Sequence, residues 1–130
     1  MSKILETIRE LPKMLPLKKA TPVEIDDAEM LLCLRFADEY REYLSEFGAI
    51  LADCIELTGI AKSEHRNVVS VTKQEWELNK NVPHNMYVIE NIGIDGIIIW
   101  QDSNGTIYQS TPNNNPIKIA DSLAGYLLKQ

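Results

Sequence analysis

The sequence predicts a single-domain α+β fold for this chain of 130 residues. Helical patterns fill the first half of the chain, whereas the second half alternates strand-like segments with turn residues. Strands joined by such short turns pair antiparallel, so we expect helices packed against a mostly antiparallel or mixed sheet. A composition of 45% hydrophobic and 25% charged residues is that of an ordinary globular protein.

Residues 1–20 are expected to form a short helix and a connector within this domain. Apolar residues recur at helical spacing before Pro12, which ends the run: Ile4, Leu5, Ile8 and Leu11. The stretch from Pro12 to Ala20 is rich in proline and lysine, and we interpret it as the connector.

The next helix has a clear N-terminal signal. Thr21 is a natural N-cap with Pro22 at the first helical position, and Glu24 completes a capping box. The helix is predicted to run to about Leu34. Its buried face consists of four apolar residues: Ile25, Ala28 and Leu32, widened by Leu31.

A further helix is predicted over residues 38–47. Its apolar residues fall at i, i+3, i+4 and i+7 and make one buried stripe: Tyr40, Tyr43, Leu44 and Phe47. Gly48 follows as a C-terminal stop.

The middle of the chain gives shorter signals. Residues 50–57 are typical of one strand. Further on, Thr72 and Glu75 match a second capping box, which predicts a short helix through Trp76 and Leu78.

The C-terminal half predicts four strands and a closing helix. The unbroken apolar run Ile97–Trp100 indicates a strand covered on both faces. Asn104-Gly105 favours a tight turn with positive φ. The strands are expected over residues 86–92, 94–101, 106–109 and 117–119.

The closing helix is expected after the last strand. Either Asp121 or Ser122 caps it, and its inward residues are Leu123, Tyr126 and Leu127.

Catalytic motifs are absent from the sequence. Nucleophilic catalysis needs Ser, Cys or Thr beside a base, and only His65 and His84 could be histidine bases. Neither belongs to a recognisable motif, and no single carboxylate pair stands out among 19 acidic residues. We therefore predict no enzyme and no catalytic residues.

Metal and cofactor motifs are absent as well. Cys33 and Cys54 form no metal-binding or disulfide pattern, and we interpret them as reduced thiols that serve as small core residues. The stretch Asp102–Gly105 imitates the start of a calcium loop, but Asn113 stands at the position of the final Glu. The turn interpretation is preferred there, so no metal and no cofactor is predicted.

The charge of the chain points to a basic protein as partner. The formal net charge is −6, and residues 21–57 carry ten acidic side chains against two basic ones. Nucleic acid is not expected as a direct partner, because phosphate binding needs clustered Lys and Arg. Opposite fields instead speed the encounter with a basic protein.

Acidic residues concentrate on the helix over residues 38–47. Only Arg41 interrupts this surface, which is either a solvated face that keeps the protein soluble or a docking surface for a basic partner. The candidate contact residues are Asp38, Glu39, Glu42 and Glu46, then Asp53 and Glu56, with Trp76 as an aromatic contact. Trp76 could also be a core residue, and Trp100 is expected to be one.

The N-terminal residues contain no long apolar run. They match neither a signal peptide nor a membrane span, so a cytoplasmic location without membrane contact is expected.

The helix patterns resemble those of the SUKH superfamily, the Smi/Knr family named after a fungal cell-wall regulator and widespread in bacteria. Ile25, Glu29 and Leu32 match its apolar-x-x-x-Glu-x-x-Leu helix. The next family motif, Leu-Pro-x-x-Tyr-x-x-Phe-Leu followed by an aromatic residue and Gly, is filled by five residues: Tyr40, Tyr43, Leu44, Phe47 and Gly48. Phe36-Ala37 stand where Leu-Pro is usual.

The C-terminal half is also similar to this family. The turn at residues 102–105 is followed by Ile107-Tyr108, and residues 119–127 resemble the family's closing Ala-x-Ser-Phe-x-x-Phe-Leu helix. Leu123 stands there in place of Phe, which indicates a divergent branch.

The resemblance implies a six-stranded or similar mixed sheet flanked by helices. It also implies an immunity protein, which binds and neutralises a cognate polymorphic toxin, often a nuclease. We expect the protein to be a monomer or weak homodimer. Two alternatives stay open. One is a regulatory or scaffold module of the Smi/Knr type in cell-wall or signalling regulation, and the other is a small hydrolase with an acidic site.

Overall fold

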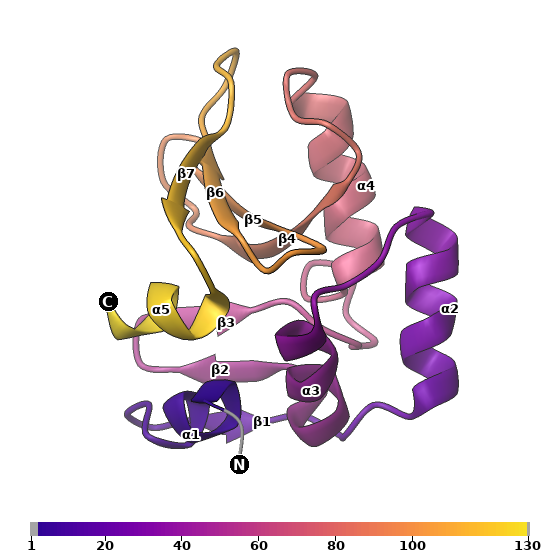
Figure 1. Ribbon diagram of the computed structural model, residues 1–130, viewed down its shortest axis with the longest axis vertical. Helices are drawn as coiled ribbons and strands as arrows, with labels where there is room; N and C mark the ends of the chain where they lie inside the picture. The colour runs from indigo at the N-terminus through magenta and orange to yellow at the C-terminus, as the bar shows by residue number, and fades with distance from the viewer. Residues whose placement is uncertain (1–2, 130) are drawn as a thin grey trace.

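The structure, a computed structural model that describes residues 3–129, confirms the α+β class. Its strands form two antiparallel sheets, one in the lower and one in the upper half of the molecule (Figure 1). The resemblance implied one larger mixed sheet, whereas the described residues form a three-stranded and a four-stranded sheet. The first contains β1 (Leu15–Pro16), β2 (Ile50–Ala52) and β3 (Ile55–Leu57), and the second contains β4 (Met86–Asn91), β5 (Ile98–Asp102), β6 (Ile107–Ser110) and β7 (Ile117–Ala120).

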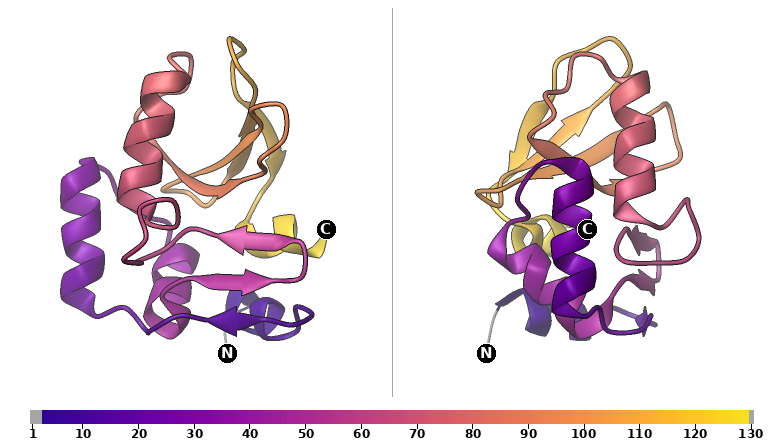
Figure 2. Two further views of the ribbon diagram at one scale, coloured as in Figure 1. Left: turned by 180° about the vertical axis from the view of Figure 1, so that it is seen from behind. Right: turned by 90° about the vertical axis from the view of Figure 1, so that its right-hand side faces the viewer.

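The helices lie on selected faces of the two sheets. One face of the three-stranded sheet is covered by α1, α3 and α5, and no described helix covers the other (Figure 2, left). Helix α4 packs against β4, and α2 lies beside α4 and α3 (Figure 1). Their bounds are α1 Lys3–Arg9, α2 Pro22–Leu32, α3 Asp38–Phe47, α4 Val68–Leu78 and α5 Leu123–Leu128.

The two acid-rich helices begin where the sequence predicts. The capping box of α2 is formed: the Thr21 N–H donates to Glu24 Oε1 at 2.9 Å, and the Glu24 N–H donates to Thr21 Oγ1 at 3.2 Å. The helix ends at Leu32, because Cys33 takes a left-handed conformation with φ 55°. The predicted stripe of α3 is fully buried, and Gly48 ends that helix.

The prediction of one strand over residues 50–57 is wrong. The segment forms the hairpin of β2 and β3, with Leu51 opposite Glu56. Asp53 and Cys54 make its turn, and Cys54 has a φ of 63°. Asp53 is of a type favoured in turns, but the apolar residues on both sides continue the strand pattern, and the reversal was missed.

The predicted capping box at Thr72 is also wrong, although the helix through Trp76 and Leu78 exists. Helix α4 begins earlier, because Asn67 is its N-cap and accepts hydrogen bonds from the Val69 and Ser70 N–H groups. Thr72 lies inside the helix, where its hydroxyl accepts a hydrogen bond from the Val88 N–H at 3.0 Å.

The C-terminal predictions are confirmed with shifted limits. The strand predicted from residue 94 begins at Ile98, and β5 is buried on both faces as far as Gln101. Gly105 has a φ of 93° in the turn that joins β5 to β6. Ser122, one of the two predicted caps, is the N-cap of α5. That helix buries Leu123, Tyr126 and Leu127 as predicted.

The cysteines are not core residues. Cys33 and Cys54 are both exposed free thiols, and both adopt positive φ at the end of an element. The prediction of small buried residues fails because each thiol lies at a chain reversal, where the side chain is turned to solvent.

The two sheets meet at Thr58, directly after β3. Its N–H donates to the Ile89 carbonyl at 2.9 Å, and its hydroxyl donates to the Val88 carbonyl at 2.7 Å. Helix α3 contacts the same residue, since the Tyr43 hydroxyl donates to the Thr58 carbonyl at 2.8 Å and the Tyr40 hydroxyl lies 3.0 Å from Thr58 Oγ1. Thr58 therefore joins β3, β4 and α3.

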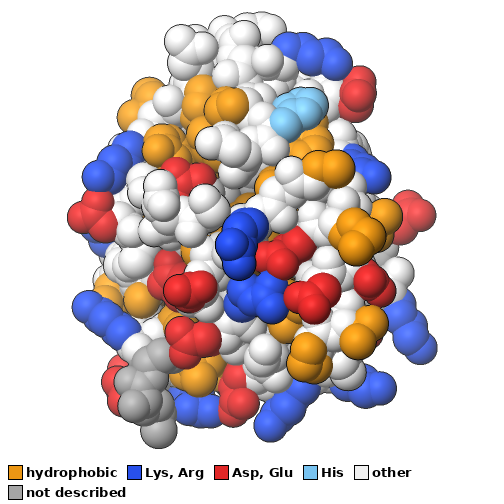
Figure 3. Space-filling view, turned by 45° about the vertical axis from the view of Figure 1, so that its right-hand side comes forward, with side chains coloured by type: hydrophobic (Ala, Val, Ile, Leu, Met, Phe, Trp, Pro, Cys, Tyr) orange, Lys and Arg blue, Asp and Glu red, His pale blue; other side chains and the backbone are white. Residues whose placement is uncertain are grey.

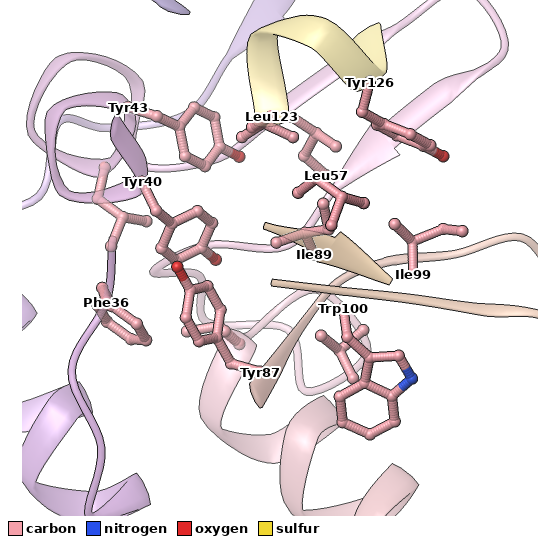
Figure 4. Close-up of a cluster of buried hydrophobic side chains, with 14 of the residues drawn as sticks. Phe36, Tyr40, Tyr43, Leu57, Tyr87, Ile89, Ile99, Trp100, Leu123 and Tyr126 are labelled. Carbon is pink, nitrogen blue, oxygen red and sulfur yellow. The ribbon is translucent and has the colours of Figure 1, made fainter. Parts of the chain in front are cut away.

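Aromatic rings surround this junction (Figure 4). The ring centroids of Phe36 and Tyr87 lie 4.8 Å apart, and those of Tyr40 and Tyr87 lie 4.9 Å apart. Edge-to-face and tilted pairs at this distance contribute about 0.5–1.5 kcal/mol each beyond the area they bury. Trp100, predicted as core, is fully buried beside this cluster.

Replacing Thr58 tests its role as the junction. Thr58→Val keeps the shape and removes the hydroxyl. The buried Val88 carbonyl loses this donor, and the Tyr40 hydroxyl keeps only the Thr58 carbonyl, at 3.3 Å. We expect the free energy of unfolding to fall by about 1–3 kcal/mol in urea denaturation. The control Thr111→Val, in the loop before β7, should change it by less than about 0.5 kcal/mol. Equal effects of the two substitutions would remove Thr58 from this role.

A buried carboxyl on β4 gives a prediction on pH. Glu90 is 5% exposed, and it accepts hydrogen bonds from the Tyr126 hydroxyl at 2.6 Å and from the Glu56 N–H at 3.2 Å. Burial raises the pKa of Glu90 above its ordinary value of 4.5 despite these hydrogen bonds. Because the folded protein holds this proton more tightly than the unfolded chain does, stability is lost as the pH rises through the raised pKa.

Glu90→Gln removes this titration while keeping an acceptor. We measure the free energy of unfolding of both proteins by urea denaturation at pH 4 and at pH 8. The value for the variant minus the value for the original protein should be larger at pH 8 than at pH 4. Glu77→Gln, at an exposed position of α4, should show no such dependence. If the free energies of unfolding of Glu90→Gln and the original protein differ by the same amount at both pH values, the raised pKa of Glu90 is contradicted.

Candidate protein-binding surface

Two of the predicted acidic contacts stand free on α3. Asp38 and Glu42 lie one turn apart, both are exposed, and neither forms an ion pair with a described residue. They line a shallow hollow of about 550 Å³ together with Arg41, Ser45 and Glu46. Neighbouring like charges at this spacing destabilise a helix by about 0.2–0.5 kcal/mol. Asp38 recovers part of this through the helix dipole, because it lies in the first turn of α3, whereas Glu42 does not.

Glu46 lies on the same helix, but its charge is compensated. Its carboxylate pairs with the Arg9 guanidinium and lies 3.6 Å from Lys19 Nζ. Basic residues of the N-terminal segment thus neutralise the last acidic residue of α3. The attraction of Glu46 for a partner is weaker than that of Asp38 or Glu42 for this reason.

Glu39 is used inside the molecule. Its carboxylate accepts hydrogen bonds from Gln101 Nε2 at 2.7 Å and from the Leu123 and Ala124 N–H groups at the start of α5. Burial raises the pKa of Glu39, while these donors oppose the rise by stabilising the charged form. Glu39 therefore joins α3 to β5 and α5, and its oxygens are occupied by the protein itself.

An ion-pair network fixes α3 against α2. Arg41 Nη1 donates to Glu29 Oε1 at 2.6 Å, and Arg41 Nη2 donates to Asp26 Oδ1 at 3.2 Å. The second oxygen of Glu29 accepts the Phe36 N–H at 2.8 Å, which holds the loop between the helices. The Glu of the family-like helix motif thus orders the turn into α3.

The outer side of α2 exposes large hydrophobic residues that sequence reasoning missed. Val23 is 67% and Met30 is 74% exposed, and at 100° per residue both fall opposite the buried face of the helix. Leu31, predicted to widen the buried face, is instead 58% exposed. The signal was present in the sequence, since Val23 and Met30 lie off the stripe of Ile25, Ala28 and Leu32.

Together these residues form one surface across the two helices, the α2–α3 surface. It consists of Val23, Asp26 and Met30 on α2 and Asp38 and Glu42 on α3, with the Arg41 ion pairs between them. Figure 3 shows acidic, basic and hydrophobic side chains on this side of the molecule. Exposed apolar groups within a charged rim are the anatomy of a protein-binding surface.

The other acidic candidates lie elsewhere. Asp53 is exposed in the turn between β2 and β3, and Glu56 extends from β3 on the uncovered face of the three-stranded sheet. Helix α3 covers the opposite face of this sheet. The structure thus divides the predicted acidic contacts between two sides of the molecule.

Trp76 belongs to the core. It is 8% exposed, its indole N–H donates to the Met86 carbonyl at 3.2 Å, and its ring stacks on His84 at a centroid distance of 4.2 Å. Of the two interpretations of Trp76, the structure supports the core residue over the exposed contact.

The residues that the structure describes, 3–129, form neither a metal site nor a membrane-spanning helix. No group of three or more His, Cys, Asp or Glu residues is placed to hold a metal ion among these residues. None of their helices combines the length and apolar character needed to cross a membrane.

Comparison with known proteins identifies the family. The SUKH_5 family model, described as SMI1-KNR4 cell-wall, matches residues 1–129. The chain belongs to this family. A crystal structure of a protein from Pseudomonas syringae pv. tomato superposes with a TM-score of 0.72 at 16% identity, over 97% of this chain and 94% of that one. This likeness supports the α+β fold, and no curated protein matches the sequence.

Glu39 and Glu42, three residues apart on α3, form a matched pair for testing which acids the fold needs. Glu39→Ala leaves donors of Gln101 and α5 without an acceptor, so we expect a loss of about 1–3 kcal/mol in the free energy of unfolding. Glu42→Ala should change it by less than about 0.5 kcal/mol. Thermal and urea unfolding measure both, and a larger loss for Glu42→Ala would reverse these assignments.

Proposed function

We propose that this SUKH protein is an immunity protein, which binds and neutralises a toxin protein with a basic surface through the α2–α3 surface. Family membership supports a role in binding rather than catalysis. The observation that carries the proposal is that Asp38 and Glu42 are exposed on α3 without ion pairs to described residues, while the neighbouring helix α2 exposes Val23 and Met30. We place this encounter in the cytoplasm of the toxin-producing cell, with the protein as a monomer or weak homodimer.

The two kinds of side chain have different tasks in this proposal. The free carboxylates attract a basic partner over a distance and speed its association, an effect that salt screens. The apolar side chains of Val23 and Met30 lose water on contact and slow dissociation. A nuclease toxin suits such a surface, because the groove that holds its nucleic acid is itself basic.

The second candidate is a regulatory or scaffold module of the Smi/Knr type. The cell-wall description of the matching family model favours it. It predicts a partner among the cell's regulatory proteins and no toxin gene beside this one, so gene neighbourhood separates the two.

Charge reversal tests the α2–α3 surface directly. The partner to be used is the purified C-terminal domain of any toxin-like protein that is encoded next to this gene. The double variant Asp38→Lys, Glu42→Lys should slow association about tenfold at low salt and flatten its salt dependence, measured by stopped-flow or surface plasmon resonance. Met30→Ala should instead raise the dissociation rate.

The matched control changes the net charge by the same amount elsewhere. Glu64→Lys with Glu77→Lys reverses two exposed acids outside this surface. If both double variants slow association equally, net charge alone steers the partner and the α2–α3 surface has no special part. If the toxin domain does not bind at high micromolar concentration, the immunity proposal fails for this pair.

A further inference from the structure

A second surface of the molecule has the opposite charge. A hollow of about 750 Å³ lies between the connector after β1 and the loop from β3 to α4. Four basic side chains and one carboxylate, that of Glu24, line it, although the chain as a whole has a net charge of −6. We call it the basic hollow, and its basic residues are Lys18, Lys19, Lys62 and Arg66.

Part of this charge is available to a ligand. Glu24 is already engaged, since its Oε1 accepts the Thr21 N–H of the capping box. Lys19 Nζ lies 3.6 Å from Glu46 Oε1. Lys18 and Lys62 are exposed, and neither forms an ion pair with a described residue. The balance of the hollow is positive, at four cations against one anion.

Arg66 gives the hollow a directional group. Its side chain is only 17% exposed, and its Nε and Nη2 atoms are buried with no hydrogen-bond partner among the described residues. Glu56 Oε2, 3.9 Å from Nε, is too far to accept a hydrogen bond. A buried guanidinium with unused donors is costly, and its planar fork fits the two oxygens of a phosphate or carboxylate.

The remaining walls are partly apolar. Leu17, Ile60 and Ala61 line the hollow beside the cations. Its volume is in the range of sites for small organic ligands, which combine apolar walls with a few polar groups that fix orientation. A free inorganic ion would make no contact with these apolar side chains.

We propose that the basic hollow binds a small organic molecule that carries a phosphate or carboxylate group. Nε and Nη2 of Arg66 are closed to solvent in the free protein, so the side chain rotates on binding and brings these donors to the oxyanion. Lys18 and Lys62 attract the ligand, and its apolar body packs on Leu17 and Ile60. This site does not rest on the immunity proposal, because it needs an anionic ligand and shares no residue with the α2–α3 surface.

The test is an NMR titration of the full ¹⁵N-labelled chain with phenyl phosphate and with benzoate, each an oxyanion on an apolar ring. The reference titration is sodium chloride at matched ionic strength. We expect saturable shifts of the amide signals of residues 60–67 and of the Arg66 Nε–H signal. Tighter binding of phenyl phosphate assigns a phosphate ligand, and tighter binding of benzoate assigns a carboxylate. Shifts no larger than those with chloride overturn the proposal.

Variants fix the site. Arg66→Gln should weaken binding at least about tenfold, which is 1.4 kcal/mol. Lys62→Gln, at an exposed position that does not threaten folding, should weaken it several-fold. Lys80→Gln lies beyond the far end of α4, about 16 Å along the helix from the hollow, and should leave binding unchanged. Binding that survives Lys62→Gln and Arg66→Gln unchanged places the ligand elsewhere and overturns the assignment.

Discussion

The hydrogen bonds at Thr58 are the constraint on which the arrangement of the two sheets depends. The backbone and hydroxyl of this one residue bond to β4, and two tyrosines of α3 bond to it from the other side. Because all these groups are buried, a displacement of either sheet would leave several of them without partners at once. The relative position of the three-stranded and four-stranded sheets is therefore fixed by polar geometry as well as by the aromatic rings around it.

The acidic residues of the chain serve two separate ends. Glu29, Glu39 and Glu90 are bound by donors of the protein itself and hold the α2–α3 loop, α5 and β3 in place. Asp38 and Glu42 have no such task, and they face solvent. A negative net charge therefore says little by itself about binding, because the acids that stabilise the fold and those free to meet a partner alternate along one helix.

Sequence patterns predicted what depends on local periodicity and missed what depends on tertiary partners. The buried stripe of α3 and the capping box of α2 follow from spacing within one helix, and both were found. The turn at Cys54 lies inside an apolar strand pattern, and it was missed. The start of α4 at Asn67 was missed because the local match at Thr72 and Glu75 was preferred to it. The different roles of Glu39 and Glu42, three residues apart, are set by Gln101 and Leu123, which are remote in the sequence. The basic hollow likewise combines two segments that no pattern connects.

Helix α5 depends for its stability on elements that are synthesised before it. It has six residues, too few for a stable helix in isolation, and it rests on carboxyls supplied by α3 and β4. During synthesis the ribosome makes both of these elements before α5. Until α5 is made, Glu39 has only the Gln101 amide as a donor, and Glu90 has only the Glu56 N–H. Docking of α5 then supplies the Leu123 N–H to Glu39 and the Tyr126 hydroxyl to Glu90, so both carboxyls reach their full set of donors only when this short helix is in place.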